Sequence, residues 1–527
     1  MAGSVRAGVI GLVATAAGLG AGEVAAAFTR PEAAPIVVVA NRFIAGTPEW
    51  LKQFAIGQFG TSDKDALRIG IYAVIAALAV AVGLRAVERL RNGLIGVALF
   101  TLVGALCALT TSAHRPSDVV PTLVAGTATA AAVWFLVRRL ASERGGVDAR
   151  SVGPGTGPSG VEPSGVDPSG PDRRTVLIVV GPVAAAAAGL AWGGRSLQHR
   201  RFDAARSRHR VVLPAPVEPE PAALPARADL GRSPVPFVTR NEDFYRIDTA
   251  YVVPQIEAES WQLRITGAVE RPLTLTFADL LRRPLVERWI TLVCVSNEVG
   301  GYLTGTALWR GARLAPLLRE AGIRPGADQL VCRSKDGMTI GTPVAAVMDG
   351  RDALLAVGMN GVPLPLAHGF PVRMVVPGLY GYVSACKWIT EIEVTTFAAY
   401  DAYWVRNGWL AQGPIQLGSR IDTPAGGRRV RTGDTVTVAG VAWHQHVGVA
   451  RVEVRVDDGP WMGADLGTVP SSDTWRQWTV PWRVVERGAH TVTVRAVSAD
   501  GGVQDTAIRR PLPGAASGLH RITVTAT

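Results

Sequence analysis

Cysteine is scarce in this chain of 527 residues, which has four, at positions 107, 294, 332 and 386. No two of them show CxxC spacing, so the sequence predicts neither a disulfide framework nor a zinc or iron–sulfur site. A disulfide between Cys332 and Cys386 remains open in an oxidising compartment.

Histidine is also rare, with eight residues, and only His114 lies near the apolar N-terminal segments. Paired histidines are the usual axial ligands of membrane haem, and no CxxCH motif occurs, so we expect no haem. Electrons would then pass to a separate carrier, a cytochrome or a quinone.

Charged residues make up only 18% of the chain, although the formal net charge is +11. Arginines cluster at the ends of apolar segments, as at Arg85, Arg89 and Arg91, where they would meet lipid headgroups. The sequence has no basic and aromatic surface of the kind that reads nucleic acid, so we expect no nucleic-acid partner.

Hydrophobic residues are abundant, at 48%, and the mean hydropathy is +0.21. Five apolar segments, each close to the ~20 residues that cross a bilayer, occupy 7–28, 67–87, 93–112, 118–137 and 175–193. Residues 1–195 therefore read as a membrane domain with about five helices. The arginine bias places the loops after segments two and four in the cytoplasm and everything after residue 195 outside it. The basic stretch 195–210 argues against this orientation.

Four further features of the membrane domain can be interpreted from the sequence, two of them in more than one way. The stretch "TPEWLKQFAIGQFG" is typical of an interfacial amphipathic helix. Residues 145–174 read as a cytoplasmic linker, in which 151–172 repeat a Pro-Ser-Gly unit. Arg173 and Arg174 before an apolar segment resemble a twin-arginine export signal, or are ordinary positive-inside arginines. Glu23 is a candidate polar site within the first segment, or serves helix pairing.

In the rest of the chain the composition and the residue pattern change twice. Residues 196–236 are rich in Pro, Ala and Arg and read as a second linker. In 237–412 short β runs alternate with helical segments, which predicts an α+β domain. Residues 413–527 show only alternating strands with Asp-Gly turns, which predicts an immunoglobulin-like β-sandwich. The predicted fold class is thus multi-domain: transmembrane helices, an α+β domain and a β-sandwich.

Three stretches of the α+β domain carry the candidate chemistry. Cys294 follows the strand-like "RWITLV", residues 359–388 read "MNGVPLPLAHGFPVRMVVPGLYGYVSACKW", and residues 241–248 read "NEDFYRID". Together they resemble the sulfite oxidase family of molybdopterin enzymes, over about residues 235–527. The resemblance implies an oxidoreductase with a molybdenum–molybdopterin cofactor. The C-terminal sandwich is similar to the family's dimerisation domain, which implies a homodimer.

The resemblance also implies roles for single residues. Cys294 would bind molybdenum through its thiolate, as suits a metal that soft sulfur ligands bind well. His368 and Arg373 would donate to the pterin phosphate. The other cofactor contacts implied by the matching segments are Tyr245, Arg246, Asp336, Ser384 and Lys387. Cys294, Arg246 and Glu298 are the catalytic candidates.

Each of these residues has a plainer interpretation as well. A lone buried cysteine is most often a small hydrophobe. His368 taken alone would be a hydrogen-bonded structural histidine, Arg373 and Lys387 surface charges, and Tyr245 core packing.

Glu298 departs from the family pattern. It stands where sulfite-oxidising members carry an arginine, and a carboxylate would repel an anion such as sulfite. The family's active-site tyrosine has no match either, because the residue nearest to its position in the motif is Met338. Sulfite as substrate is therefore in doubt, and we expect oxygen-atom transfer on a small sulfur or nitrogen compound. Glu298 would handle protons there, or is a surface carboxylate.

A rival hypothesis from another class is a non-catalytic, membrane-tethered binding or assembly protein that keeps the fold. Its partner surface would be the tryptophan-rich sandwich, although such residues more often fill a core or a dimer interface. These tryptophans are Trp443, Trp461, Trp475, Trp478 and Trp482.

Overall fold

The computed structural model describes residues 2–48, 51, 54, 58, 63–111, 114–148, 173–218 and 224–527. Most of the predicted amphipathic stretch 47–60 and all of the Pro-Ser-Gly repeat 151–172 lie outside these residues. The chain divides into two compact units. The first contains residues 1–203 and 249–255, and the second contains residues 204–248 and 256–527.

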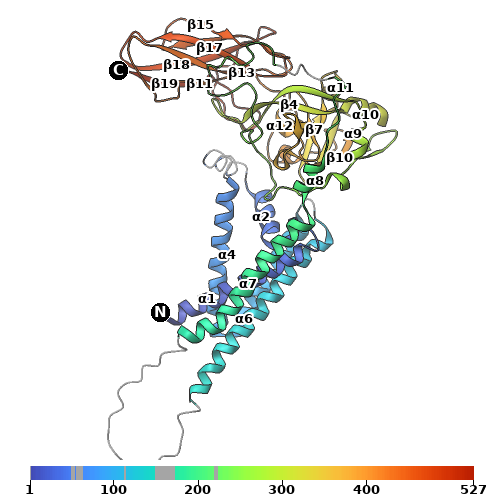
Figure 1. Cartoon of the computed structure of the whole chain (residues 1–527), viewed down its shortest axis with the longest axis vertical. Helices are drawn as coiled ribbons and strands as arrows, with labels where there is room; N and C mark the ends of the chain where they lie inside the picture. Colours follow the sequence, from blue (N-terminus) through green and yellow to red (C-terminus); the bar gives the residue numbers. More distant parts are fainter. Residues whose placement is uncertain are drawn as a thin grey trace, which may run out of the picture. The chain divides into compact units, whose positions relative to one another are not determined.

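The first unit is helical (Figure 1). Its helices are α1 Ala2–Ala26, α2 Pro35–Gly46, α4 Asp63–Glu88, α5 Leu90–Thr110, α6 Val119–Asp148 and α7 Arg173–Arg201, with short 3-10 turns at η1 Pro31–Ala33 and η3 Pro116–Asp118. Among the described residues, five helices are long and apolar enough to cross a membrane, and each overlaps one of the five predicted segments. The short apolar helix α2 was not predicted, because its 12 residues are too few for a span.

Helix α1 is the centre of this unit and packs against α4, α6 and α7. Glycine permits a close approach of α1 to α4, since a Cβ at Gly11 would lie 1.9 Å from the Ala79 carbonyl oxygen, and one at Gly83 would lie 2.1 Å from that of Ala7. Gln198 of α7 donates a hydrogen bond of 2.9 Å to the Glu23 carboxylate. This contact favours helix pairing as the role of Glu23.

A buried ion pair joins the loop after α1 to the turn before α6. Arg30 Nε donates to Asp118 Oδ1 at 2.8 Å, and a second guanidinium nitrogen contacts Oδ2. The Arg115 amide donates to the same carboxylate at 2.7 Å. The Asp118 side chain is only 2% exposed. Each charge is therefore compensated where water is excluded.

The prediction of a linker at 196–236 is wrong for most of its residues. Helix α7 continues to Arg201, α8 spans Ala204–Arg210, and Arg208 Nε donates to the Leu364 carbonyl at 2.7 Å. The Val217 amide then donates to the Leu285 carbonyl at 2.7 Å. The segment has no core of its own, but its backbone and arginines pair with residues more than 45 positions away, which composition does not reveal.

The second unit begins with an α+β domain of two sheets. One sheet has the order β2-β1-β10-β5-β6, and the other β3-β4-β7-β8 with β9 paired to β7. The strands are β1 Gln262–Gly267, β2 Leu273–Thr276, β3 Leu285–Val293, β4 Thr304–Arg313, β5 Gln329–Ser334, β6 Thr339–Pro343, β7 Leu354–Met359, β8 Val362–Pro363, β9 Arg373–Val375 and β10 Ile389–Thr395. The helices and 3-10 turns are η4 Ala258–Ser260, α9 Phe277–Leu281, α10 Leu314–Ala321, α11 Val344–Met348, η5 Leu366–His368, α12 Gly381–Ser384 and α13 Tyr403–Arg406.

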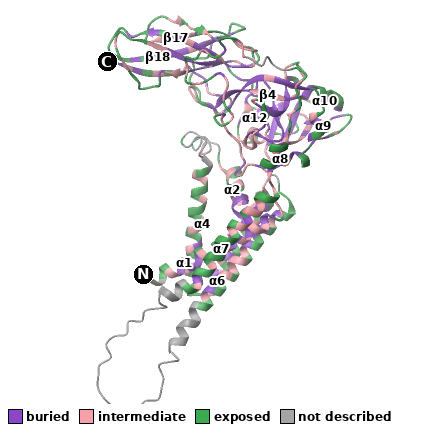
Figure 2. Cartoon of the chain, viewed as in Figure 1, coloured by how far each residue is buried: buried purple, intermediate pink, exposed green. Residues whose placement is uncertain are grey.

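The last part of the chain is the predicted β-sandwich. Its sheets have the orders β11-β13-β17-β16 and β12-β19-β18-β14-β15. The strands are β11 Gly418–Thr423, β12 Arg429–Val430, β13 Thr435–Trp443, β14 Val449–Val456, β15 Met462–Gly463, β16 Asp465–Leu466, β17 Arg476–Arg483, β18 Gly488–Ser498 and β19 Arg521–Ala526. Alternate positions on β17 and β18 are buried between the sheets (Figure 2). Trp478 and Trp482 belong to this core, so they are not a partner surface.

The sandwich and the α+β domain share backbone contacts within the second unit. The Trp475 indole donates to the Phe237 carbonyl at 3.0 Å, and its amide donates to Thr291 Oγ1 on β3 at 2.8 Å. Trp475 is 1% exposed. The sandwich therefore supports β3 from outside its own sheet.

The ion pair before α6 generates the first prediction. Asp118→Ala leaves the Arg30 guanidinium buried without this carboxylate, which should cost about 3 kcal/mol of stability. Thermal unfolding of the full chain in detergent measures the loss. Asp65→Ala is the control, because Asp65 is 69% exposed in its pair with Arg68 and should cost less than about 0.5 kcal/mol. Equal effects of the two variants would contradict the importance of the buried pair.

Candidate active site

Cys294 lies directly after β3, in which eight of the nine residues are buried. Strand β3 pairs with β4 up to Val293 and Thr304, and the Cys294 amide adds one more bond to the Leu303 carbonyl, at 2.9 Å. The chain then turns, as the Asn297 amide donates to the Cys294 carbonyl at 3.1 Å. Asn297 Oδ1 accepts from the Leu303 amide at 2.8 Å and fixes the loop. The thiol, 8% exposed, is thus placed by a rigid strand.

The paired glycines after this turn contact the sandwich. Gly300 has φ of +80°, and a Cβ there would lie 2.4 Å from the His520 ring. Arg420 of β11 donates to the Gly301 carbonyl at 2.8 Å. Only glycine fits both the left-handed backbone at 300 and this close approach.

Two buried tyrosines lie close enough to Cys294 for its thiolate to raise their pKa values. Burial is the larger cause for both, and it raises the pKa of Tyr380 to about 12 and that of Tyr245 further. A Cβ on Gly381 would be 3.7 Å from both the Tyr245 hydroxyl and the Val293 carbonyl. Tyr380 was not singled out from the sequence, although it lies within the quoted "VVPGLYGY". The family motif pointed instead to Met338, in the β5–β6 turn, as the residue nearest to the active-site tyrosine.

Arg373 on β9 is a buried cation, with 5% of its surface exposed. Its two terminal nitrogens donate to the carbonyls of His368 and Ala385 at 3.3 and 3.4 Å. The Nε atom is buried without a hydrogen-bond partner among the described residues, which also provide no carboxylate for an ion pair. Burial lowers the pKa of Arg373 to about 10. A surface charge is therefore ruled out as its role.

His368 is held neutral beside this guanidinium. Its Nε2 donates to the Asn241 carbonyl at 3.0 Å. Burial first, and then the charges of Arg373 and Lys387, lower its pKa to about 3. Arg373 donates to the His368 carbonyl, so these two residues of one sequence segment are neighbours.

Asp248 organises the remaining cations of the pocket. Its carboxylate accepts from Lys387 Nζ at 2.7 Å and from Arg246 Nε at 2.8 Å, and its side chain is 4% exposed. Asp336 is near enough to Asp248 for that charge to add to burial in raising its pKa. Sequence reasoning missed Asp248, the last residue of the quoted "NEDFYRID".

The remaining candidates are Ser384 and Glu298, followed by the other cysteines. Ser384 Oγ donates to the carbonyls of Leu379 and Tyr380 at 2.9 and 3.0 Å, so its hydroxyl stabilises the turn into α12. Glu298 is exposed on the loop after Cys294. None of the four cysteines, all in the described part of the chain, forms a disulfide. Cys332 Sγ instead contacts the Met374 sulfur at 3.6 Å.

Comparisons with known proteins agree with this geometry. Residues 250–404 match the family model described as an oxidoreductase molybdopterin binding domain, and residues 419–494 match a bacterial Ig domain. The chain is 32% identical over 153 residues to the uncharacterized oxidoreductase YuiH of Bacillus subtilis, covering 29% of this chain and 74% of that protein. It is 30% identical over 325 residues to sulfite oxidase of Gallus gallus, covering 52% of this chain and 69% of that enzyme.

Two further known proteins are similar to this chain. Mitochondrial sulfite oxidase of Drosophila melanogaster is 30% identical over 345 residues, or 56% of this chain and 58% of the relative. The chain thus spans less than two thirds of the first curated relatives that it matches. The solved structure of the sulfane dehydrogenase SoxCD from Paracoccus pantotrophus gives a TM-score of 0.48 at 25% identity, covering 55% of this chain and 81% of that one.

The site and these matches define a molybdopterin-binding oxidoreductase domain. The chain belongs to the sulfite oxidase family, whose members use a molybdenum–molybdopterin cofactor. The residues present fit this group. A buried thiol ends β3, and three cations, Arg246, Arg373 and Lys387, suit an anionic phosphate. The unsatisfied Arg373 Nε is a donor that such an anion would satisfy.

Removal of the buried guanidinium should separate cofactor binding from stability. Arg373→Met should reduce molybdenum per chain about tenfold or more, because charge-assisted hydrogen bonds are lost. The cofactor-free protein should keep its melting temperature, since a buried charge without a carboxylate is replaced by an apolar side chain of similar length. Elemental analysis and thermal unfolding measure the two quantities. Arg264→Met, on a side chain 60% exposed, is the control; an Arg373→Met protein with full molybdenum would refute the assignment.

The lowered pKa of His368 predicts a pH dependence of stability. Between about pH 6.5 and pH 3 the unfolded chain binds a proton at this ring that the folded chain does not, so stability falls as pH is lowered through this window. Urea unfolding of the cofactor-free protein at pH 7, 6 and 5 measures how steeply the free energy of unfolding depends on pH. This slope should be smaller in His368→Gln, by at most about 1.4 kcal/mol per pH unit. Equal slopes in both proteins would exclude a buried neutral histidine.

Proposed function

We propose that this chain is a membrane-anchored molybdopterin oxidoreductase that transfers an oxygen atom and two electrons on a small sulfur or nitrogen compound, with its active site outside the cytoplasm. The observation that carries the proposal is the buried thiol of Cys294 at the end of β3, with two tyrosines beside it and the uncompensated cation Arg373 in the same cofactor domain. An anionic, metal-bearing group would account for both the thiol and the cation.

The residues have distinct roles in this proposal. Cys294 would ligate molybdenum, and Arg373, Arg246 and Lys387 would hold the pterin and its phosphate. When bound, the cofactor supplies the two-electron and oxygen-atom exchange, while the protein positions the substrate. Tyr245 and Tyr380 stay protonated because their pKa values are raised, so both can donate a hydrogen bond to substrate oxygen. Glu298 would exchange protons with solvent.

The overall reaction balances in either direction. In reduction, a sulfoxide or N-oxide takes up two electrons and two protons and releases a sulfide or amine and one water. In oxidation, water supplies the oxygen and the two electrons leave the site. The electron partner would be a separate cytochrome or a quinone.

The anchoring part of the proposal has independent support. Five helices have the length and composition of membrane spans, and arginines at their ends favour the α+β domain outside the cytoplasm. Arg173 and Arg174 would act as a twin-arginine export signal or as positive-inside charges. A homodimer would form through the sandwich.

The second candidate function is that of a non-catalytic tethered protein, and the burial of the tryptophans argues against it. Trp475 and Trp478 are at most 1% exposed, and Trp443 and Trp482 are 7% exposed. Trp461 is half-buried, and the guanidinium groups of Arg455 and Arg495 lie 4.9 and 4.1 Å from its ring centroid. Trp475, Trp478 and Trp482 therefore fill interiors and do not form an exposed partner surface.

Metal analysis of the purified full chain in detergent tests the proposal. We expect about one molybdenum atom per chain, bound with a soft thiolate ligand. Cys294→Ser should abolish turnover of dimethyl sulfoxide and trimethylamine N-oxide with a reduced viologen dye. Cys107→Ser, in α5, is the matched control and should keep both metal and turnover. A folded native chain without molybdenum would refute the proposed function.

A further inference from the structure

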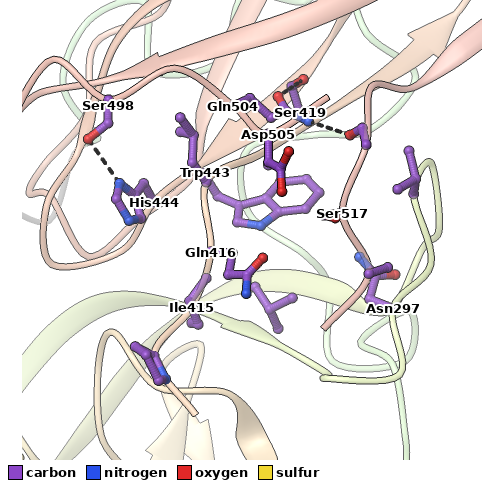
Figure 3. Close-up of a pocket in the computed structure, with 18 of the residues that line it drawn as sticks. Asn297, Ile415, Gln416, Ser419, Trp443, His444, Ser498, Gln504, Asp505 and Ser517 are labelled. Atoms are coloured by element: carbon purple, nitrogen blue, oxygen red, sulfur yellow. Dashed lines mark hydrogen bonds between the residues drawn. The ribbon is translucent and has the colours of Figure 1, made fainter. Parts of the chain in front are cut away.

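A cavity of about 430 Å³ lies between the Cys294 loop and the sandwich. On the α+β side it is lined by Val293, the residue before Cys294, and by Asn297 and Tyr380. On the sandwich side the indole of Trp443 forms its middle (Figure 3). The cavity therefore begins beside the proposed metal ligand and is closed by the second domain.

The charge of the lining is negative. Three carboxylates line it, those of Glu298, Asp500 and Asp505, and no described residue of the lining is a lysine or arginine. Hydrogen bonds from Ser498 and the Gly502 amide lower the pKa of Asp500, so it is ionised at neutral pH.

The neighbouring basic groups do not reverse this sign. His444 is in the lining, and burial lowers its pKa, so it is uncharged at neutral pH. Outside the lining, Arg509 pairs with Asp505 at 2.6 Å, and Arg420 pairs with Asp422 at 2.5 Å. Glu298 and Asp500 thus keep a net negative charge at the cavity.

Two buried side chains offer hydrogen-bond donors to the same space. Trp443 is 7% exposed, and its indole nitrogen has no hydrogen-bond partner among the described residues; it faces Gln416 across the cavity (Figure 3). Asn297 is 8% exposed, and its oxygen is occupied by the Leu303 amide. Its amide nitrogen therefore has donors left for a ligand.

The backbone is shaped to hold the Trp443 ring in this position. A Cβ at Gly418 would lie 2.7 to 2.8 Å from the indole, including its nitrogen. Glycine at 418 therefore lets the ring lie against β11. The indole of Trp443 lines the cavity, and its N–H can donate to a ligand or water there.

We propose that this cavity is the substrate site and that it selects a positively charged sulfoxide or N-oxide, whose oxygen accepts from Asn297 and Trp443 while its cationic group lies against Glu298 and Asp500. The reaction rests on the proposed function, but the charge preference is a property of binding alone. Oxyanions are disfavoured at the same place.

Binding of three probes of matched size tests the charge preference without turnover. Benzylammonium, benzyl alcohol and benzoate are titrated calorimetrically into the full chain in detergent at low salt. One carboxylate about 4 Å from the charge changes affinity about fivefold in water, so benzylammonium should bind at least about fivefold more tightly than benzoate. Glu298→Gln should reduce this ratio about fivefold. Asp458→Asn, an exposed carboxylate in the turn after β14 and outside the lining, is the control and should leave the ratio unchanged.

A second measurement tests the oxygen contact. 4-(Methylsulfinyl)benzylammonium should bind more tightly than benzylammonium to the native chain, and Trp443→Phe should remove most of that difference. Benzoate binding as tightly as benzylammonium, or a ratio that Glu298→Gln does not change, would overturn the proposal.

Turnover separates this proposal from the proposed function. Among 4-(methylsulfinyl)benzylammonium, its neutral benzyl alcohol analogue and its benzoate analogue, kcat/KM should fall in that order. Fastest turnover of the anion would refute the charge preference while the oxygen-transfer function stands. A chain without molybdenum that still prefers benzylammonium would refute the function and leave the cavity's selectivity in place.

Discussion

The buried guanidinium of Arg373 is the constraint on which the cofactor pocket depends. A charge taken out of water without a carboxylate is costly, and here its Nε atom also has no hydrogen-bond partner among the described residues. The surroundings reduce that cost only in part. Trp309 presents its ring face 5.0 Å from the guanidinium, which is a weak cation–π contact, and His368 stays neutral so that it adds no second charge. An anion in the pocket would satisfy all of these groups at once.

The same logic explains why the sandwich is part of the site. Strand β3 brings Cys294 to the surface of the α+β domain, but the loop after it is fixed from the other side, by Arg420 on Gly301 and by the His520 ring against Gly300. A module that served only to join two copies would not need these contacts. The cavity beside Cys294 exists because both domains contribute to its wall.

Several parts of this arrangement could be predicted from the sequence because their signals are local. Apolar segments of membrane length became helices, and Cys294, His368 and Arg373 lie within contiguous motifs. Features that depend on distant partners could not be predicted. Asp118 meets Arg30 across 88 positions, Asp248 meets Lys387 across 139, and Tyr380 reaches Cys294 only through the fold. Residues 196–236 resembled a linker because a segment that packs on another domain needs no hydrophobic period of its own.

Two electrostatic regions of opposite sign lie in this second unit. The proposed cofactor pocket contains Arg246 and Lys387 on the Asp248 carboxylate, together with Arg373, whereas the cavity beside Val293 carries Glu298 and Asp500 without a lysine or arginine in its described lining. Coulomb interactions weaken quickly with distance in water but less so between buried groups. Under the two proposals, the positive region would act on a cofactor held inside the protein, and the negative region would act on a molecule that arrives from solvent. A family fold that binds one anion as its cofactor would, under these proposals, reject another as its substrate.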